Sequence, residues 1–573
     1  MIRSFVFLPA AMAAACLSAA EPTADLILHG GRVVTVDAAM RVVEALAVRN
    51  GRILAVGTND EVLRLRGEKT ETIDLAGKAV LPGLIDSHTH PTGAAMYEFD
   101  HPIPEMNSVG DVLDYVADRA RTLGPDKWIT IRQVFITRLK ERRYPTKAEL
   151  DAAAPNNPVE FSTGPDSSVN SLALKLSGID KNFVSTDPAA KIEKDPATGE
   201  PTGILRSAGR YLKKTGSGRS ATRDEADERL RLLFADYNAN GITGICDRSA
   251  GQDNVAAYQR LLSAEKLTVR VAASRGVGNS GPVEKLVESI KNVADEPLVD
   301  GGPMLRIVGI KCFLDGGMLT GSAYMRQPWG VSDIYSIVDP QYRGMLYIPD
   351  EKLVPMVRAA VESKLQFTAH SVGDGAVHAL LAAYEKVNEE SPVAPTRPCL
   401  THSNFMSREA VELAAKLGVV VDIQPAWLWL DGETLRAQFG DARLRYFQPL
   451  KSLFEAGVPV GGGSDHMQKI GPLRSVNPYH PFLGMWITQS RMPRGGVSPL
   501  HAEERLTREQ ALQMYTINNA RLMFLEDQVG SLVPGKFADL IVVDRDPLAC
   551  PLEDLVETKV LRTYLAGKLV YEY

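Results

Sequence analysis

The chain has 573 residues, of which 45% are hydrophobic and 23% are charged, and its formal net charge is −6. This ordinary globular composition excludes a disordered chain and a disulfide-stapled mini-protein, and the absence of a Lys/Arg-rich run argues against a nucleic-acid partner. The length suits about three or four domains, or one large barrel with additions. Only ten residues are histidine, so the positions of the histidines are informative.

The N-terminal residues are typical of a secretory signal peptide covering 1–20. Arg3 precedes an apolar stretch, and the small residues Ser18 and Ala20 precede the expected cleavage site. The stretch is too short to cross a membrane, and no other part of the sequence approaches about 18 uninterrupted apolar residues. We therefore expect an exported protein, periplasmic or secreted, without a membrane span. A lipoprotein anchored at Cys16 is less favoured, because the leucine expected ahead of it is missing.

Both ends of the mature chain have the pattern of short β-strands. Between 24 and 80 the apolar residues alternate, and Asn50-Gly51 is a strong signal for a two-residue hairpin turn. The last fifty residues return to the same pattern. We therefore expect one β-sandwich domain assembled from 21–80 and 525–573.

The middle of the chain predicts an α/β fold, because eight apolar, β-branched runs alternate with helical stretches. This pattern is typical of a (β/α)₈ TIM barrel, here over 81–90 and 226–524. The predicted strands lie at 80–85, 242–246, 268–273, 305–313, 366–369, 398–401, 418–423 and 459–463. The predicted helices include 254–265, 351–363, 375–388 and 408–416.

The stretch from 91 to 225 is too long for one connection between a strand and a helix. It contains strand-like segments of its own, such as 128–135 and 157–163. We interpret it as an inserted α+β subdomain after the first barrel strand, placed to cover the mouth of the barrel.

Histidines and one acid end several of the predicted barrel strands, where the reactive groups of such barrels lie. In an extended strand, residues i and i+2 point the same way, so His88 and His90 project two imidazoles to one side. Imidazole nitrogens and a carboxylate suit Zn²⁺ and similar divalent ions. An isolated HxH pair is common outside metal sites, but the coincidence on five strands favours a shared metal site. The candidate ligands are His88, His90, Lys311, His370, His402 and Asp465.

At these residues the sequence resembles the amidohydrolase superfamily, and specifically its YtcJ-like branch, amidohydrolase family 3. The matching motifs are LPGLIDSHTHP at 81–91, GIKCFLDGGMLTGSAY at 309–324, TAHSVGD at 368–374, THSN at 401–404, GGSD at 462–465 and GSLVPGKFADLIVVDRDP at 530–547. The resemblance implies a metal-dependent barrel with a terminal β-sandwich and a site for one or two metals. It assigns His88 and His90 to one Zn²⁺, His370 and His402 to a second, Lys311 to a carbamylated bridging ligand, and Asp465 to a ligand that also shuttles protons.

The role of Lys311 has a chemical rationale. A protonated ammonium group would be repelled by two cations, whereas the carbamate formed from a neutral amine and CO₂ is an anion with two oxygens. The alternative is a buried ion pair between Lys311 and Asp315, which would leave a mononuclear site.

Substrate recognition is less specified by the sequence. Tyr324, Trp329 and Trp427 follow barrel strands and could form aromatic pocket walls, although core packing is the more frequent role of such residues. His466 adjoins a candidate ligand and could also contact substrate or support the ligand. Relatives in the YtcJ-like branch commonly carry a histidine in a turn where this chain has Pro165, which leaves the substrate open.

These observations predict a metal-dependent hydrolase that cleaves a non-peptide C–N bond of a small molecule. The bond would belong to an amide, a cyclic amide, an N-formyl amine or an N-acyl amine, attacked by a metal-activated hydroxide with Asp465 as proton shuttle. One alternative is a mononuclear deaminase acting on an amidine-type substrate. The alternative from another class is a non-catalytic exported binding protein on the same scaffold. The sequence leaves open whether the chain forms a homo-oligomer.

Overall fold

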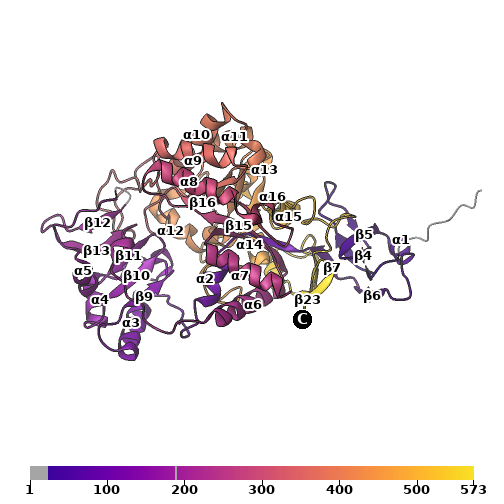
Figure 1. Cartoon of the computed structure of the whole chain (residues 1–573), viewed down its shortest axis with the longest axis horizontal. Coiled ribbons are helices and arrows are strands. Elements are labelled where there is room, and N and C mark those ends of the chain that lie inside the picture. The colour runs from indigo at the N-terminus through magenta and orange to yellow at the C-terminus, as the bar shows by residue number, and fades with distance from the viewer. Residues whose placement is uncertain (1–22, 188–189) are drawn as a thin grey trace, which may run out of the picture.

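The computed structural model describes residues 23–187 and 190–573, and its centre is an eight-stranded parallel barrel (Figure 1). The barrel strands follow one another in chain order, and at the mouth His466 forms a parallel bridge to Thr89, which joins the last strand region to the first. The strands are β8 (Leu84–Thr89), β14 (Ile242–Ala250), β15 (Arg270–Gly276), β16 (Leu305–Phe313), β17 (Gln366–Ser371), β18 (Cys399–His402), β19 (Val420–Ile423) and β20 (Val460–Gly462). The predicted α/β barrel is therefore confirmed.

The prediction of one barrel strand over 80–85 was wrong in one respect, because these residues belong to two strands in different sheets. β7 (Ala79–Pro82) pairs in an outer sheet, and β8 begins the barrel two residues later. Gly83 lies between them, packed so closely against the Thr243 side chain that a Cβ atom would collide with it. An apolar run shows that a segment is extended, but not that it stays in one sheet.

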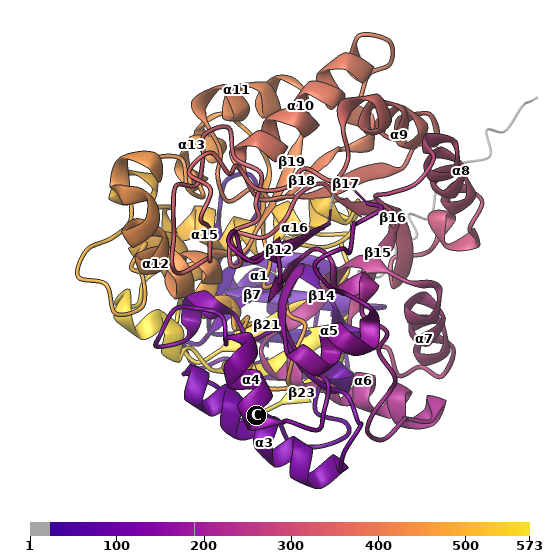
Figure 2. The same cartoon turned by 90° about the vertical axis from the view of Figure 1, so that its left-hand side faces the viewer.

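Helices surround the barrel, as Figure 2 shows, because each buries one apolar side against the strands. In α10, the buried residues Val377, Leu380, Leu381 and Tyr384 recur at the helical spacing, and the Tyr384 hydroxyl donates to the Phe367 carbonyl of β17 at 3.0 Å. The helices of this layer are α6 (Arg223–Ala239), α7 (Gln252–Ser263), α8 (Val283–Ala294), α9 (Asp350–Glu362), α10 (Asp374–Asn388), α11 (Arg408–Lys416), α12 (Pro425–Arg443), α13 (Leu450–Glu455), α14 (Pro481–Ser490), α15 (Arg508–Met514) and α16 (Ile517–Leu522).

Two further sheets lie at the end of the molecule opposite the inserted region (Figure 1), and one of them contains strands from both chain ends. In that sheet β7 pairs with β21, so that Leu81 faces Ile541 across the ladder. Its strand order is β23 (Lys568–Glu572), β22 (Val560–Leu565), β21 (Leu540–Val543), β7, β2 (Arg32–Val34) and β3 (Val42–Val43). The other sheet has the order β5 (Arg52–Gly57), β4 (Ala45–Arg49), β1 (Leu26–His29) and β6 (Glu71–Asp74), with the short helix α1 (Asn59–Leu63) beside it.

The inserted region forms a separate five-stranded sheet with its own helices, and in Figure 2 it lies in front of the barrel. Its elements are α2 (Pro91–Met96), α3 (Val109–Leu123), β9 (Ile129–Arg132), α4 (Lys147–Ala153), β10 (Val159–Thr163), β11 (Asp166–Val169), α5 (Ser171–Ser177), β12 (Lys191–Lys194) and β13 (Pro201–Arg206). Thr163 pairs with Asp166, so the two residues between them, Gly164 and Pro165, form a tight turn that joins β10 to β11. The boundaries proposed for the individual domains stay predictions.

The predicted signal peptide lies outside the described residues, so export and the alternative anchor at Cys16 stay predictions as well. Within 23–187 and 190–573, no helix is long and apolar enough to cross a membrane.

A buried ion pair joins the barrel to the sheet built from both chain ends. Arg270 in β15 donates from Nε and Nη2 to the two carboxylate oxygens of Asp539, at 2.5 and 2.9 Å. Both side chains are almost fully buried, and Asp539 also accepts the backbone N–H of Ala566. The pair therefore fixes the end of β21 against the barrel.

We expect Asp539→Ala to lower the free energy of unfolding by about 3–5 kcal/mol, because it leaves the Arg270 charge buried without a partner. The shift of the urea unfolding midpoint measures this loss. Glu412→Ala is the matched control, since it removes an ion pair with Arg408 whose side chains are 62% and 76% exposed; its effect should stay below about 1 kcal/mol. Equal midpoints for the two variants would contradict the prediction.

Candidate metal centre

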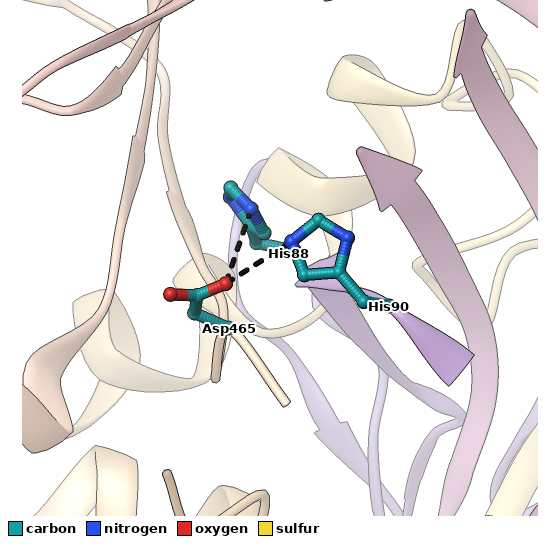
Figure 3. Close-up of side chains that lie close together, drawn as sticks. All are labelled: His88, His90 and Asp465. Carbon is teal, nitrogen blue, oxygen red and sulfur yellow. Dashed lines mark ion pairs between the residues drawn. The ribbon is translucent and has the colours of Figure 1, made fainter. Parts of the chain in front are cut away.

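Three of the predicted ligands lie together at the mouth of the barrel. His88 belongs to β8, His90 follows it before α2, and Asp465 follows β20. Asp465 Oδ1 lies 3.4 Å from His88 Nε2 and 3.2 Å from His90 Nε2 (Figure 3). One ligand atom from each residue falls within 4.8 Å of the others. Two imidazoles and a carboxylate at this spacing fit a divalent metal ion.

The backbone at this site adopts conformations that side chains rarely take. Asp465 has a φ of 56° and His402 a φ of 72°, both in the left-handed region. The Asp465 N–H donates to the His88 carbonyl at 2.8 Å, so the two chain segments that carry these ligands are joined directly. Such conformations persist only where the surrounding structure holds them, and they gather at functional sites.

The other predicted ligands lie around the same site. The rings of His370 and His402 are 4.5 Å apart between centroids, and those of His88 and His402 are 4.8 Å apart. The side chain of Lys311, in β16, is almost fully buried. The structure thus brings all six predicted residues to one cavity, although only His88, His90 and Asp465 form a close group of ligand atoms.

Hydrogen bonds to one ring nitrogen decide which nitrogen of each histidine remains free. His88 Nδ1 donates to Asp422 Oδ2 at 3.0 Å, and His402 Nδ1 donates to Gln424 Oε1 at 2.7 Å. Gln424 Nε2 in turn donates to Asp422 Oδ1 at 2.9 Å. The Nε2 atoms of His88 and His402 are thereby left to bind a metal, in the arrangement that commonly orients metal-binding histidines.

Asp422 and Gln424 were missed by the sequence analysis. Both come from the region of β19, the seventh barrel strand, for which no metal ligand or ligand partner was predicted. A signal was available, because Asp422 is a charged residue within an otherwise apolar strand and a buried charge requires partners. The strand alone could not show that the partner would be His88.

A buried arginine lies next to the same carboxylate oxygen of Asp422 that His88 contacts. Arg248 in β14 approaches Asp422 Oδ2 with Nε at 3.4 Å, and its Nη1 donates to Ser274 Oγ and Gln366 Oε1, both at 3.0 Å. The side chains of Arg248 and Asp422 have no exposed surface. Their opposite charges compensate each other inside the barrel, which makes this carboxylate tolerable there.

Asp315 organises the loops beside His370 and does not pair with Lys311. Its carboxylate accepts the backbone N–H groups of Tyr324, Val372 and Gly373, each at 2.9 Å. His370 Nε2 is 3.2 Å from the Gly316 carbonyl, which leaves its Nδ1 free. Among the described residues no ion pair joins Lys311 to Asp315, so the alternative role suggested for that pair finds no support.

Burial favours the neutral form of the imidazoles of His88, His370 and His402 and makes Lys311 easier to deprotonate. It lowers the pKa of Lys311 to about 8, with a smaller lowering by Arg248 that the carboxylate of Asp422 opposes. Burial and the charge of Lys311 lower the pKa of His370 to about 3, and burial holds the pKa values of His88 and His402 well below the usual range. Neutral imidazoles are the form that binds metals. Lys311 Nζ has no hydrogen bond or ion pair within the described part of the chain.

A cavity of about 1230 Å³ connects the site to the inserted region. Trp427 lines it and stacks on His402, with ring centroids 4.9 Å apart. Pro165, at the β10–β11 turn, also lines it and lies close to Gly317 in the loop after β16. The inserted region therefore covers the barrel mouth.

Three of the four tentative substrate residues make their contacts outside the cavity, so a role for them in substrate binding stays a prediction. Trp329 is buried, donates from Nε1 to the Ala323 carbonyl at 2.8 Å and packs against Tyr335. His466 accepts from the Tyr237 hydroxyl at 2.7 Å and donates to backbone carbonyls. Tyr324 packs over Gly375 at the start of α10. None of these three is part of the cavity lining in the described residues, because a position after a strand does not fix the direction of a side chain.

Comparison with known proteins gives one consistent result. Residues 71–571 match the model of an amidohydrolase family. The chain is 31% identical to the N-substituted formamide deformylase of Arthrobacter pascens, over 96% of this chain and 98% of that protein. It is 26% identical to the putative amidohydrolase YtcJ of Bacillus subtilis, over 95% and 99% of the two chains. A crystal structure of an uncharacterised metal-dependent hydrolase from Pyrococcus horikoshii superposes with a TM-score of 0.65, at 21% identity, over 92% and 99% of the chains.

We expect Asp422→Ala to weaken metal binding about 10–100-fold, because His88 loses the partner that orients its ring. Titration against a chelator of known affinity measures the change. Asp374→Ala is the matched control, since Asp374 starts α10 beside the site and accepts the backbone N–H of Arg326. Its metal affinity should equal that of the wild type; unchanged affinity in Asp422→Ala would refute the orienting role.

Proposed function

We propose a substrate class from the premise that this chain belongs to the amidohydrolase family and is a hydrolase of carbon–nitrogen bonds other than peptide bonds. It cleaves an amide, cyclic amide, N-formyl amine or N-acyl amine of a small molecule. The observation that carries the proposal is the group formed by His88, His90 and Asp465 at the inner end of a large cavity. A divalent metal ion is the cofactor that this group and the family support.

We propose further that the site holds two Zn²⁺ ions. His88, His90 and Asp465 would hold one, and His370 and His402 the other. Lys311 would bridge them as a carbamate, formed when the neutral amine adds CO₂ and releases one proton. Supporting this, Lys311 Nζ faces the cavity without an ion pair among the described residues, and both second-site histidines keep one ring nitrogen free.

The chemistry divides between the metal and the chain. A bound divalent ion supplies Lewis acidity, which makes water nucleophilic near neutral pH and polarises the scissile carbonyl. Asp465 would take a proton from the attacking water and deliver it to the leaving nitrogen, so that a C–O bond forms while the C–N bond breaks. His88 Nε2 and His90 Nε2 lie 3.4 and 3.2 Å from Asp465 Oδ1, so the three residues could bind one ion together. The products are a carboxylic acid and an amine.

The volume of the cavity supports a substrate that is bulky for a small molecule. The cavity, about 1230 Å³, exceeds the roughly 300–1000 Å³ usual for small-molecule pockets. Trp427 and Pro165 both line it, so an apolar group of the substrate would be accommodated. The relative from Arthrobacter pascens makes N-formyl amines the first class to test.

A mononuclear deaminase is the second candidate, because the close group of ligand atoms contains three residues only. One metal would then suffice, and Lys311 would remain an unmodified amine. The non-catalytic binding protein considered from the sequence is not supported by the matches to hydrolases.

We expect Asp465→Asn to lower kcat about 10²–10⁴-fold while most of the metal is retained, because the amide still offers an oxygen ligand but cannot shuttle the proton. Turnover of a panel of N-formyl amines, N-acyl amines and lactams, with metal content per chain, measures both effects. A variant that turns over the panel at the wild-type rate would refute the role of Asp465.

We expect Lys311→Ala to lower the metal content by one ion per chain if the site is binuclear, because the bridging anion is lost. Lys416→Ala is the control, since Lys416 forms only an exposed ion pair with Glu385. An unchanged metal content in Lys311→Ala would favour the mononuclear alternative.

A further inference from the structure

We propose that Arg138, which belongs to the inserted region, is a positioning residue for the proton shuttle. It holds the side chain of Asn477, and Asn477 holds the backbone of Asp465. The inference rests on the proposed function of Asp465. It assigns the inserted region a part in the chemistry besides covering the cavity.

The first step is the backbone of Asp465, which needs support. Its left-handed conformation is unfavourable for a residue with a side chain, by roughly 1 kcal/mol or more. Its N–H is held by the His88 carbonyl, and its own carbonyl accepts a hydrogen bond from Asn477 Nδ2 at 2.8 Å. Asn477 is fully buried, so water cannot take over this hydrogen bond. Asn477 therefore fixes the peptide unit that aims the carboxylate.

The second step is the orientation of the Asn477 amide, which Arg138 fixes from one end and the Asp465 carbonyl from the other. Arg138 Nη1 donates to Asn477 Oδ1 at 3.1 Å and to the Val476 carbonyl at 2.6 Å. A guanidinium group can only donate, so the amide must turn its oxygen to Arg138. The Nδ2 group is then left facing the Asp465 carbonyl. Without Arg138, the hydrogen bond to the Asp465 carbonyl would be the one contact among the described residues left to hold the amide in this orientation.

The third step is the support of Arg138 itself. Its Nε and Nη2 donate to the two carboxylate oxygens of Asp431 in α12, at 3.2 and 2.9 Å. Thr137 Oγ1 also donates to Asp431, at 2.7 Å. The side chain of Arg138 is 7% exposed and that of Asp431 is not exposed at all. A two-pronged contact of this kind fixes the guanidinium plane, which a lysine cannot do.

The loop that follows Asp465 is bound to the inserted region at further points. Gln468 Nε2 donates to the Gln133 carbonyl at 2.8 Å, and Lys469 Nζ donates to the Ile103 carbonyl at 2.7 Å. Gln468 Oε1 accepts the Val476 N–H at 3.1 Å, which closes the loop on itself. The segment 465–477 is thus held against the inserted region along its length, with Arg138 at its end.

Asn477→Asp is the decisive variant, because it keeps the shape and the contact with Arg138 but presents an oxygen to the Asp465 carbonyl. We expect kcat to fall about 10–100-fold, with KM within about threefold of the wild type, and release of metal to a chelator to accelerate. Arg138→Met should reproduce both effects. The double variant Arg138→Met/Asn477→Asp should be no worse than the more impaired single variant, since both changes break one chain of contacts.

Arg206→Met is the control, because Arg206 is a fully buried arginine of the inserted region that pairs with Glu193 and donates to the Thr320 and Tyr335 carbonyls, away from Asn477. It should not accelerate the release of metal, and its effect on kcat should add to that of Asn477→Asp. If Arg138→Met does not fold, the isosteric Asn477→Asp decides. Wild-type kcat and metal release in Asn477→Asp, beside an inactive Asp465→Asn, would overturn this inference alone. An active Asp465→Asn would overturn the proposed function and the inference with it.

Discussion

The rest of the site depends on one interaction, the compensation of the buried negative charge of Asp422 by its neighbours. It lies inside the barrel without contact to solvent, where a single charge is strongly unfavourable. Its partners offset this cost: Arg248 approaches Oδ2, His88 donates to the same oxygen, and Gln424 donates to Oδ1. Because Gln424 also binds His402, one buried group orients histidines from both halves of the proposed metal centre.

The closure of the barrel follows from the same region. The His88 carbonyl accepts a hydrogen bond from the N–H of Asp465, and the His90 N–H donates to the carbonyl of His466 at 2.8 Å. These two hydrogen bonds join the first and last strand regions at the level of the ligands. A barrel that did not close here would separate Asp465 from both histidines, so the fold and the ligand geometry are one constraint.

The sequence specified those parts of the structure that depend on local pattern. The helix over 408–416 and the strand over 305–313 were predicted with their final bounds, because polar and turn residues end both runs. The ligands could be proposed because strand ends meet at the barrel mouth. The roles of Asp422 and Trp329 could not be predicted, since each role depends on which side chains or backbone groups of distant segments lie next to that residue. Periodicity within one segment carries no information about such pairs.

Two of the contact areas between the inserted region and the barrel differ in physical character. The turn at Pro165 is open to the cavity and approaches Gly317, so its side chain can change at little cost to the fold. Arg138 is buried, with hydrogen bonds to Asp431, Val476 and Asn477, so a change there disturbs several partners at once. The shape of the cavity can therefore vary at the turn while Arg138 keeps Asp465 in place. One subdomain can in this way alter which molecule is bound without altering how the proton is moved.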